Sequence, residues 1–161
     1  MRRLAPDLSA LDPERLERLE YLDACVTESM RLKPVAPFLA LDVLRDTTIG
    51  DVHVPAGTLL WCVLRHDSVD EGHFPDAAAF APQRWLDGSA DRRIPMPFGA
   101  GPRICPGRYL ALLEIKLAMA MLLGSFEIES VDAPGGGEAQ ELMSFTMSPV
   151  GLHMRLRAAR V

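Results

Sequence analysis

The hydrophobic pattern at the start of the chain predicts helical structure over residues 11–34. Apolar side chains recur there every three or four residues, the spacing that gives a helix one apolar face. These positions are Leu16, Leu19, Leu22, Val26 and Met30. Pro34 ends the pattern, because proline does not continue a helix. One helix fits this pattern, and so does a short helix followed by a longer one that joins it near Glu20.

The following apolar runs predict strands. "FLALDVL", "VHV" and "TLLWCVL" are rich in β-branched and aromatic residues, and the turn-like "IGD" and "PAG" separate them. Residues 65–97 have no sustained period, which favours a long loop with one short helical turn at most. Three aromatic side chains in this loop, Phe74, Phe80 and Trp85, indicate that it is ordered.

A second apolar stripe predicts a long helix after residue 105, with Pro106 as its first residue and Gly124 as its cap. The stripe consists of Leu110, Leu113, Leu117 and Met121. Beyond the helix, "SFEIESV", "LMSFTM" and "LHMRLRA" predict strands, the last two joined by "SPVG". The pattern as a whole indicates an α+β, mainly helical fold.

Composition narrows the class of protein. The length of 161 residues suits one domain, and 48% apolar with 24% charged residues is typical of a globular protein. A net charge of −5 disfavours a general nucleic-acid binder. The sequence has no run of about 18 apolar residues, the length of a membrane span, and its start lacks the apolar segment of a signal peptide. We therefore expect no membrane segment in this chain and a cytoplasmic location.

One short stretch carries candidate chemistry. In "PFGAGPRICPGR", glycines and prolines surround Cys105, which lies at the start of the predicted long helix. The positive end of a helix favours a thiolate over a thiol. A thiolate in a shaped loop fits either a nucleophile or a metal ligand. A nucleophile needs a base, usually histidine, whereas a thiolate ligand of haem iron needs a flat approach that small residues provide.

The same stretch resembles the haem-binding signature of the cytochrome P-450 family, F-x-x-G-x-R-x-C-x-G. The residues that carry the resemblance are Phe98, Gly99, Gly101, Arg103, Cys105 and Gly107. The resemblance implies that Cys105 is the proximal ligand of haem b iron (iron protoporphyrin IX). It also implies that Arg103 pairs with a haem propionate and that Phe98 shields the sulfur.

Two further motifs agree with this family. "ESMR" matches its E-x-x-R pair at Glu28 and Arg31, and "FAPQRW" matches its aromatic-x-Pro-x-Arg segment, which ends at Arg84. A glutamate and an arginine three residues apart are, taken alone, more often a solvated surface pair. The resemblance implies instead a structural network of Glu28, Arg31 and Arg84.

The resemblance covers the C-terminal part of the family's fold. It implies that residues 1–161 form a partial haem-thiolate oxygenase domain, without the N-terminal helices and the distal oxygen-activating helix. The implied function is a monooxygenase, as a fragment or in split form, that inserts one oxygen atom from O2 into a small organic substrate. The isolated chain is then expected to be inactive unless a complementary N-terminal chain supplies the rest. A non-catalytic haem-binding remnant is an alternative, and a thiol enzyme or structural domain without haem is another.

The resemblance also implies a substrate pocket and a redox partner. The pocket residues would be Val35, Ala36, Phe38, Phe145, Thr146 and Met147, although core packing is their ordinary role. An electron-donor protein, a ferredoxin or a flavoprotein reductase, would meet a basic face. Its residues would be Arg92, Arg93, Arg103, Arg108 and Lys116, which a solvated surface would equally explain.

Overall fold

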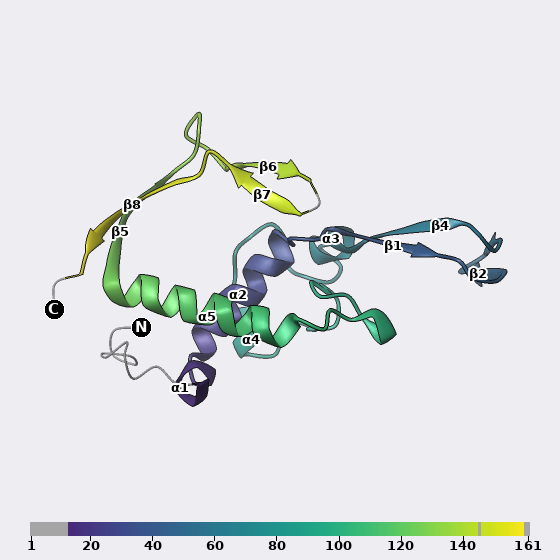
Figure 1. Cartoon of the computed structure of the whole chain (residues 1–161), viewed down its shortest axis with the longest axis horizontal. Coiled ribbons are helices and arrows are strands. Elements are labelled where there is room, and N and C mark those ends of the chain that lie inside the picture. The colour runs from purple at the N-terminus through teal and green to yellow at the C-terminus, as the bar shows by residue number, and fades with distance from the viewer. Residues whose placement is uncertain (1–12, 145, 160–161) are drawn as a thin grey trace.

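The computed structural model describes residues 13–144 and 146–159. The first helical region consists of two helices, α1 (Pro13–Glu17) and α2 (Glu20–Leu32), so the alternative with a join near Glu20 holds. Helix α5 (Arg108–Ser125) lies across them (Figure 1). The three helices share one apolar core. It comprises Leu16, Leu19, Leu22, Val26 and Ala120, with Met30, Leu112 and Met119 packed against it.

A second apolar cluster orders the long loop that follows the first strands. Ala24 of α2 packs there with Phe74, Ala77 and Trp85, all of them buried. The loop contains more helix than its sequence predicts. Its helical turns are α3 (Leu64–Ser68), at its start, and α4 (Gln83–Leu86). The 3₁₀ turn η2 (Gly101–Arg103) follows in the stretch that carries Cys105.

Within the described residues, the strands form antiparallel pairs that extend from the helical body (Figure 1). In the first half, β1 (Phe38–Asp42) pairs with β4 (Leu59–Val63), and β2 (Thr47–Ile49) pairs with β3 (Val52–Val54). In the second half, β5 (Phe126–Asp132) pairs with β8 (His153–Ala158), and β6 (Gln140–Met143) pairs with β7 (Met147–Val150).

Three expectations for the second half of the chain are wrong. "SPVG" was expected to join two strands, but Met147–Val150 is itself strand β7, and the turn lies before it. Helix α5 was expected to begin at Pro106, but residues before Arg108 remain in the cysteine loop, where the Arg108 amide donates to the Cys105 carbonyl at 3.4 Å. Gly124 lies in the last turn of α5 rather than beyond it.

The apolar stripe of α5 is exposed. Leu110 and Met121 are 60% and 51% accessible, and Leu113 and Leu117 are also exposed. The helix packs on the core through Leu112, Met119 and Ala120 instead. No helix among residues 13–144 and 146–159 is both long and apolar enough to cross a membrane.

Candidate functional site

The glycines of the cysteine loop have backbone conformations that other residues rarely adopt. Gly99 and Gly101 have φ angles of 71° and 65°, in the left-handed region that favours glycine. They bend the chain so that the Cys105 amide donates a hydrogen bond to the Phe98 carbonyl at 2.9 Å. This hydrogen bond closes the loop and brings Phe98, the first residue of the predicted signature, next to Cys105.

The thiol of Cys105 is half-buried and forms no disulfide. A Cβ atom added to Gly107 would lie 3.8 Å from its sulfur, whereas one added to Gly101 would meet open space. Phe98 is half-buried and Arg103 is exposed. Phe98, Gly99, Gly101 and Arg108 help to line a cavity of about 520 Å³ beside the loop.

This set of side chains fits a prosthetic group that brings most of its own ligands. The loop offers one sulfur, and the described residues contain no cluster of three or more His, Cys, Asp or Glu side chains that could hold a bare metal ion. Haem iron takes four ligands from its porphyrin, so one protein thiolate is enough to hold it. The open space at Gly101 and the exposed cation of Arg103 are compatible with a flat, anionic group.

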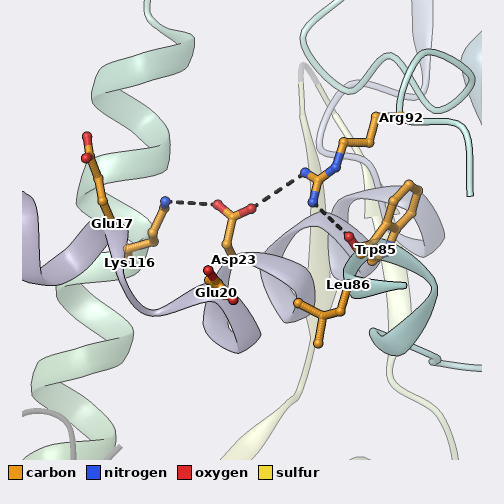
Figure 2. A pocket seen from close by; sticks show the side chains of 7 residues that line it. All are labelled: Glu17, Glu20, Asp23, Trp85, Leu86, Arg92 and Lys116. Atoms are coloured by element: carbon orange, nitrogen blue, oxygen red, sulfur yellow. Dashed lines mark hydrogen bonds and ion pairs between the residues drawn. The ribbon is translucent and has the colours of Figure 1, made fainter. Parts of the chain in front are cut away.

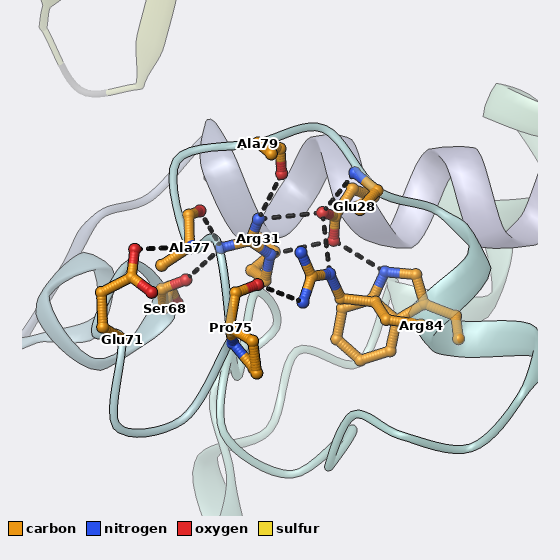
Figure 3. Close-up of polar contacts among 10 residues, drawn as sticks. Glu28, Arg31, Ser68, Glu71, Pro75, Ala77, Ala79 and Arg84 are labelled. Atoms are coloured by element: carbon orange, nitrogen blue, oxygen red, sulfur yellow. Dashed lines mark hydrogen bonds and ion pairs between the residues drawn. The ribbon is translucent and has the colours of Figure 1, made fainter.

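The three charged residues predicted as a network lie together inside the protein (Figure 3). Arg31 binds both carboxylate oxygens of Glu28, from Nε at 2.9 Å and from Nη2 at 2.8 Å. Arg84 donates from Nε to Oε1 of Glu28 at 3.2 Å. Glu28 and Arg31 are fully buried, and Arg84 is 8% exposed. The alternative of a solvated surface pair therefore does not apply.

The network also ties the long loop to helix α2. Arg31 donates to the backbone carbonyls of Ser68, Ala77 and Ala79 at 2.6, 2.8 and 3.1 Å. Arg84 reaches the carbonyl of Pro75 at 3.1 Å. Because arginine has five N–H donors, a few side chains can fix the course of a long irregular segment.

Trp85 is a fourth member of the network. Its Nε1 donates to Oε2 of Glu28 at 2.8 Å. Burial by itself raises the pKa of Glu28, but the hydrogen bonds from Arg31, Ala81 and Trp85 more than offset it and hold the pKa below its usual range. From the sequence, Trp85 was expected only as one of the aromatic residues that order the loop. Its position directly after Arg84 in "FAPQRW" is the signal that could have placed it in the network.

Four of the six predicted pocket residues share one cavity. Ala36, Phe38, Thr146 and Met147 line a space of about 360 Å³, with the Trp61 ring edge-on to that of Phe38 at 6.3 Å. The fifth, Val35, contributes its backbone, since its carbonyl accepts a hydrogen bond from the Met147 amide at 2.8 Å. Phe145 lies outside the described residues.

The predicted basic face is smaller than expected, because carboxylates neutralise three of its five cations. Asp23 lies between Lys116, at 2.9 Å, and Arg92, at 3.6 Å (Figure 2). Arg93 pairs with Asp91 at 2.6 Å, and its hydrogen bonds lower the pKa of Asp91 to about 2. The two remaining cations, Arg103 and Arg108, flank Cys105 in the sequence, and Arg108 stacks on the Tyr109 ring.

Comparison with known proteins agrees with the geometry. The family model described as Cytochrome P-450 matches residues 3–154, nearly the whole chain. This chain belongs to the cytochrome P-450 family. A probable cytochrome P-450 of Drosophila melanogaster is 34% identical over 97% of the chain. The mitochondrial 1,25-dihydroxyvitamin D(3) 24-hydroxylase of Mus musculus is 35% identical over 80% of it.

Solved structures place the fold in the same cytochrome P-450 family. The crystal structure of a cytochrome P-450, CYP102L1, superposes on 98% of the chain with a TM-score of 0.84 and 31% sequence identity. The chain spans 31% of the Drosophila relative, 25% of the mouse relative and 36% of that crystallised chain. It is thus a portion of the cytochrome P-450 fold, about a third of it or less.

Proposed function

We propose that the Cys105 thiolate is the proximal ligand of haem b in a monooxygenase that inserts one oxygen atom from O2 into a small organic substrate. The observation that carries the proposal is the loop itself, in which two left-handed glycines and the Phe98–Cys105 hydrogen bond hold one half-buried sulfur. Family membership supports haem as the group that this sulfur binds.

Each residue of the loop would have a distinct role. Gly101 leaves room for the flat ring, since nothing lies within 4 Å of an added Cβ. Arg103 would pair with a propionate, and the Phe98 carbonyl fixes the backbone that carries the sulfur. When bound, haem supplies the activation of O2, and the thiolate supplies electron density that favours O–O cleavage.

The network of Glu28, Arg31, Arg84 and Trp85 would act on haem binding from a distance. It connects α2 to the loop that precedes the cysteine segment, through the carbonyls of residues 68–79. A rigid scaffold on that side keeps the loop in one conformation before the cofactor arrives, which lowers the entropic cost of binding. Its role is structural rather than chemical.

Substrate and electrons would reach the haem from two sides. The cavity between Phe38 and Met147 would receive an apolar part of the substrate. An acidic electron donor, a ferredoxin or a flavoprotein reductase, would meet the side of the loop that carries Arg103 and Arg108. With Arg92, Arg93 and Lys116 already paired, the electrostatic attraction is weaker than five free cations would give.

The exposed stripe of α5 suggests how the rest of the fold is supplied. An apolar surface such as that of Leu110 and Met121 favours burial against a partner. We propose that it packs against the remaining two thirds of a cytochrome P-450, in the same polypeptide or as a complementary N-terminal chain. Co-expression with such a segment is expected to restore substrate oxidation, and failure to do so would count against this part of the proposal.

A carbon monoxide difference spectrum tests the central claim. The haem-loaded, reduced protein is expected to show the strongly red-shifted Soret band of thiolate ligation, and Cys105→Ala is expected to lose it. Cys25→Ala is the matched control, because Cys25 is another half-buried free cysteine, on α2. If no such band forms, or if Cys105→Ala retains it, the proposal is wrong. A band without turnover in the co-expressed protein would favour the non-catalytic alternative.

A further inference from the structure

The hairpin β6–β7 forms one wall of the Phe38–Met147 cavity and stands away from the helical body (Figure 1). Its strands pair with each other, Met143 opposite Met147, and their apolar side chains Leu142 and Met143 are 57% and 63% exposed. A segment that buries little apolar surface gains little hydrophobic stabilisation. Its position must therefore depend on the few polar contacts that it makes with the body.

Besides the backbone hydrogen bond from the Met147 amide to the Val35 carbonyl, those contacts are ion pairs of Glu141, in the middle of β6, and of Glu138, in the loop before it. Arg65 of α3 donates from Nη1 to Oε2 of Glu141 at 2.7 Å. Lys33, directly after α2, lies 3.5 Å from the same oxygen and 2.6 Å from Glu138 in the preceding loop. The Arg65 and Glu141 side chains are only 32% and 22% exposed, so this ion pair is partly shielded from water. The hydrogen bond from Arg65 lowers the pKa of Glu141, which keeps the carboxylate charged.

Both cations stand on fixed parts of the body. The Lys33 amide donates to the Ser29 carbonyl at 2.8 Å as α2 ends. Helix α3 is held at its start by Leu64, whose amide donates to the Pro37 carbonyl at 2.9 Å, and at its end by the Arg31–Ser68 hydrogen bond. Glu141 is therefore the hairpin's connection to two elements that do not depend on the hairpin.

We propose that Glu141, held by Arg65 and Lys33, is the positioning residue that keeps the β6–β7 hairpin closed over the Phe38–Met147 cavity. The Met147–Val35 hydrogen bond, at 2.8 Å, lies at the cavity and breaks if the hairpin swings out. With the ion pair intact, Thr146 and Met147 stay opposite Ala36 and Phe38. With it lost, the hairpin opens more often and the cavity widens.

The link from this hairpin to substrate choice rests on the function proposed above, whereas the closure of the hairpin does not. Closure can be measured without haem, substrate or an electron donor. In the assembled enzyme, an open hairpin would admit bulkier substrates and reduce discrimination by size.

Hydrogen exchange at the Met147 amide of the 161-residue chain tests the proposal. Glu141→Gln preserves the size of the side chain and removes its charge. We expect protection from exchange at the Met147 amide to fall about 3- to 10-fold, which corresponds to the free energy of a partly exposed ion pair. The Cys105 amide, bonded to Phe98 in a different part of the protein, is expected to keep its protection. High salt is expected to bring the unmodified chain towards the variant.

Matched variants separate the ion pair from a general loss of stability. Arg65→Gln is expected to lower the protection of the Met147 amide by no more than Glu141→Gln does, because Glu141 also pairs with Lys33. The double variant is expected to lose no more protection than Glu141→Gln alone. Glu129→Gln is the control, because Glu129 pairs with Arg157 at 3.1 Å in the separate β5–β8 strand pair. Unchanged exchange at Met147, additive losses in the double variant, or equal losses at Met147 and Cys105 would each overturn the proposal.

Discussion

Glu28 and Arg84 are 56 residues apart in the sequence, and their side chains meet in the interior, with Nε of Arg84 3.2 Å from Oε1 of Glu28. The first lies on helix α2 and the second on α4, a short helix within the long loop. The contact therefore closes the loop onto the helix. Because Arg31 and Trp85 bind the same carboxylate, four side chains share one buried charge network.

Removing the central charge of the network is expected to be costly. Glu28→Gln keeps the shape of the side chain but leaves two buried arginines without a carboxylate, which costs about 3–5 kcal/mol of unfolding free energy. Urea denaturation measures the loss. Glu129→Gln, which breaks a surface pair with Arg157, is expected to cost at most about 1 kcal/mol. Equal losses of unfolding free energy in the two variants would show that the buried network stabilises the protein no more than a surface ion pair does.

The pH dependence of stability is expected to carry the signature of Glu28. Its pKa is lower in the folded than in the unfolded protein, so its contribution is fully present above about pH 4.3, the ordinary value for a glutamate. The contribution is lost as the pH falls through the lower, folded value. The difference in stability between the unmodified chain and Glu28→Gln is thus expected to be constant near neutrality and to shrink in acid. A difference that grows in acid would contradict the assignment.

The glycines of the cysteine loop allow a test that separates backbone strain from cofactor binding. Gly101→Ala and Gly50→Ala each place a side chain at a φ near 60°, with no atom within 4 Å of the new Cβ. Each is expected to cost about 1–2 kcal/mol in urea denaturation. Only Gly101→Ala is expected to reduce haem uptake, since Gly50 lies in the turn between β2 and β3. Equal uptake by both variants would mean that the ring does not approach Gly101.

Asp23 is expected to stabilise the packing of α2 against α5 through Lys116 and against the long loop through Arg92. Asp23→Asn weakens the contact with Lys116, whose side chain is 16% exposed, and we expect a loss of about 1 kcal/mol that shrinks at high salt. Urea denaturation at two salt concentrations measures it. Asp91→Asn is the control, because its partner Arg93 is 90% exposed, and we expect no measurable change. A larger loss of unfolding free energy in Asp91→Asn than in Asp23→Asn would refute the stabilising role of Asp23.

The charged network could be predicted because its members match two short motifs of the cytochrome P-450 family, whereas their spacing alone favoured a solvated surface pair. Glu28 and Arg31 are three residues apart on one helical face, and Arg84 ends a compact motif. The backbone oxygens that complete the network could not be predicted in the same way. Every residue carries a carbonyl, so nothing in the sequence marks Ser68, Ala77 and Ala79 as acceptors.

The second half of the chain differs from its predicted strand pattern for a physical reason. Proline and glycine usually mark turns, and "SPVG" contains both, yet Pro149 lies inside β7 opposite Glu141. A two-stranded pair has only edge strands, where proline can leave its missing donor on the open side. Strand β6 ends at Met143 and β7 begins at Met147, and the sequence between them contains no glycine or proline. The sequence pattern therefore did not predict the β6–β7 hairpin that forms a wall of the cavity, although Thr146 and Met147 were predicted as pocket residues.

The hydrogen bond between Met147 and Val35 joins two backbones and uses neither side chain. The side chains at both positions can therefore be exchanged while the connection across the cavity is preserved. A library that randomises position 147, which lines the cavity, would vary that lining while the backbone connection stays in place. Proline at position 147 is the exception, because it has no amide hydrogen to donate. The side chain that faces the cavity can therefore change while the backbone that positions it stays the same.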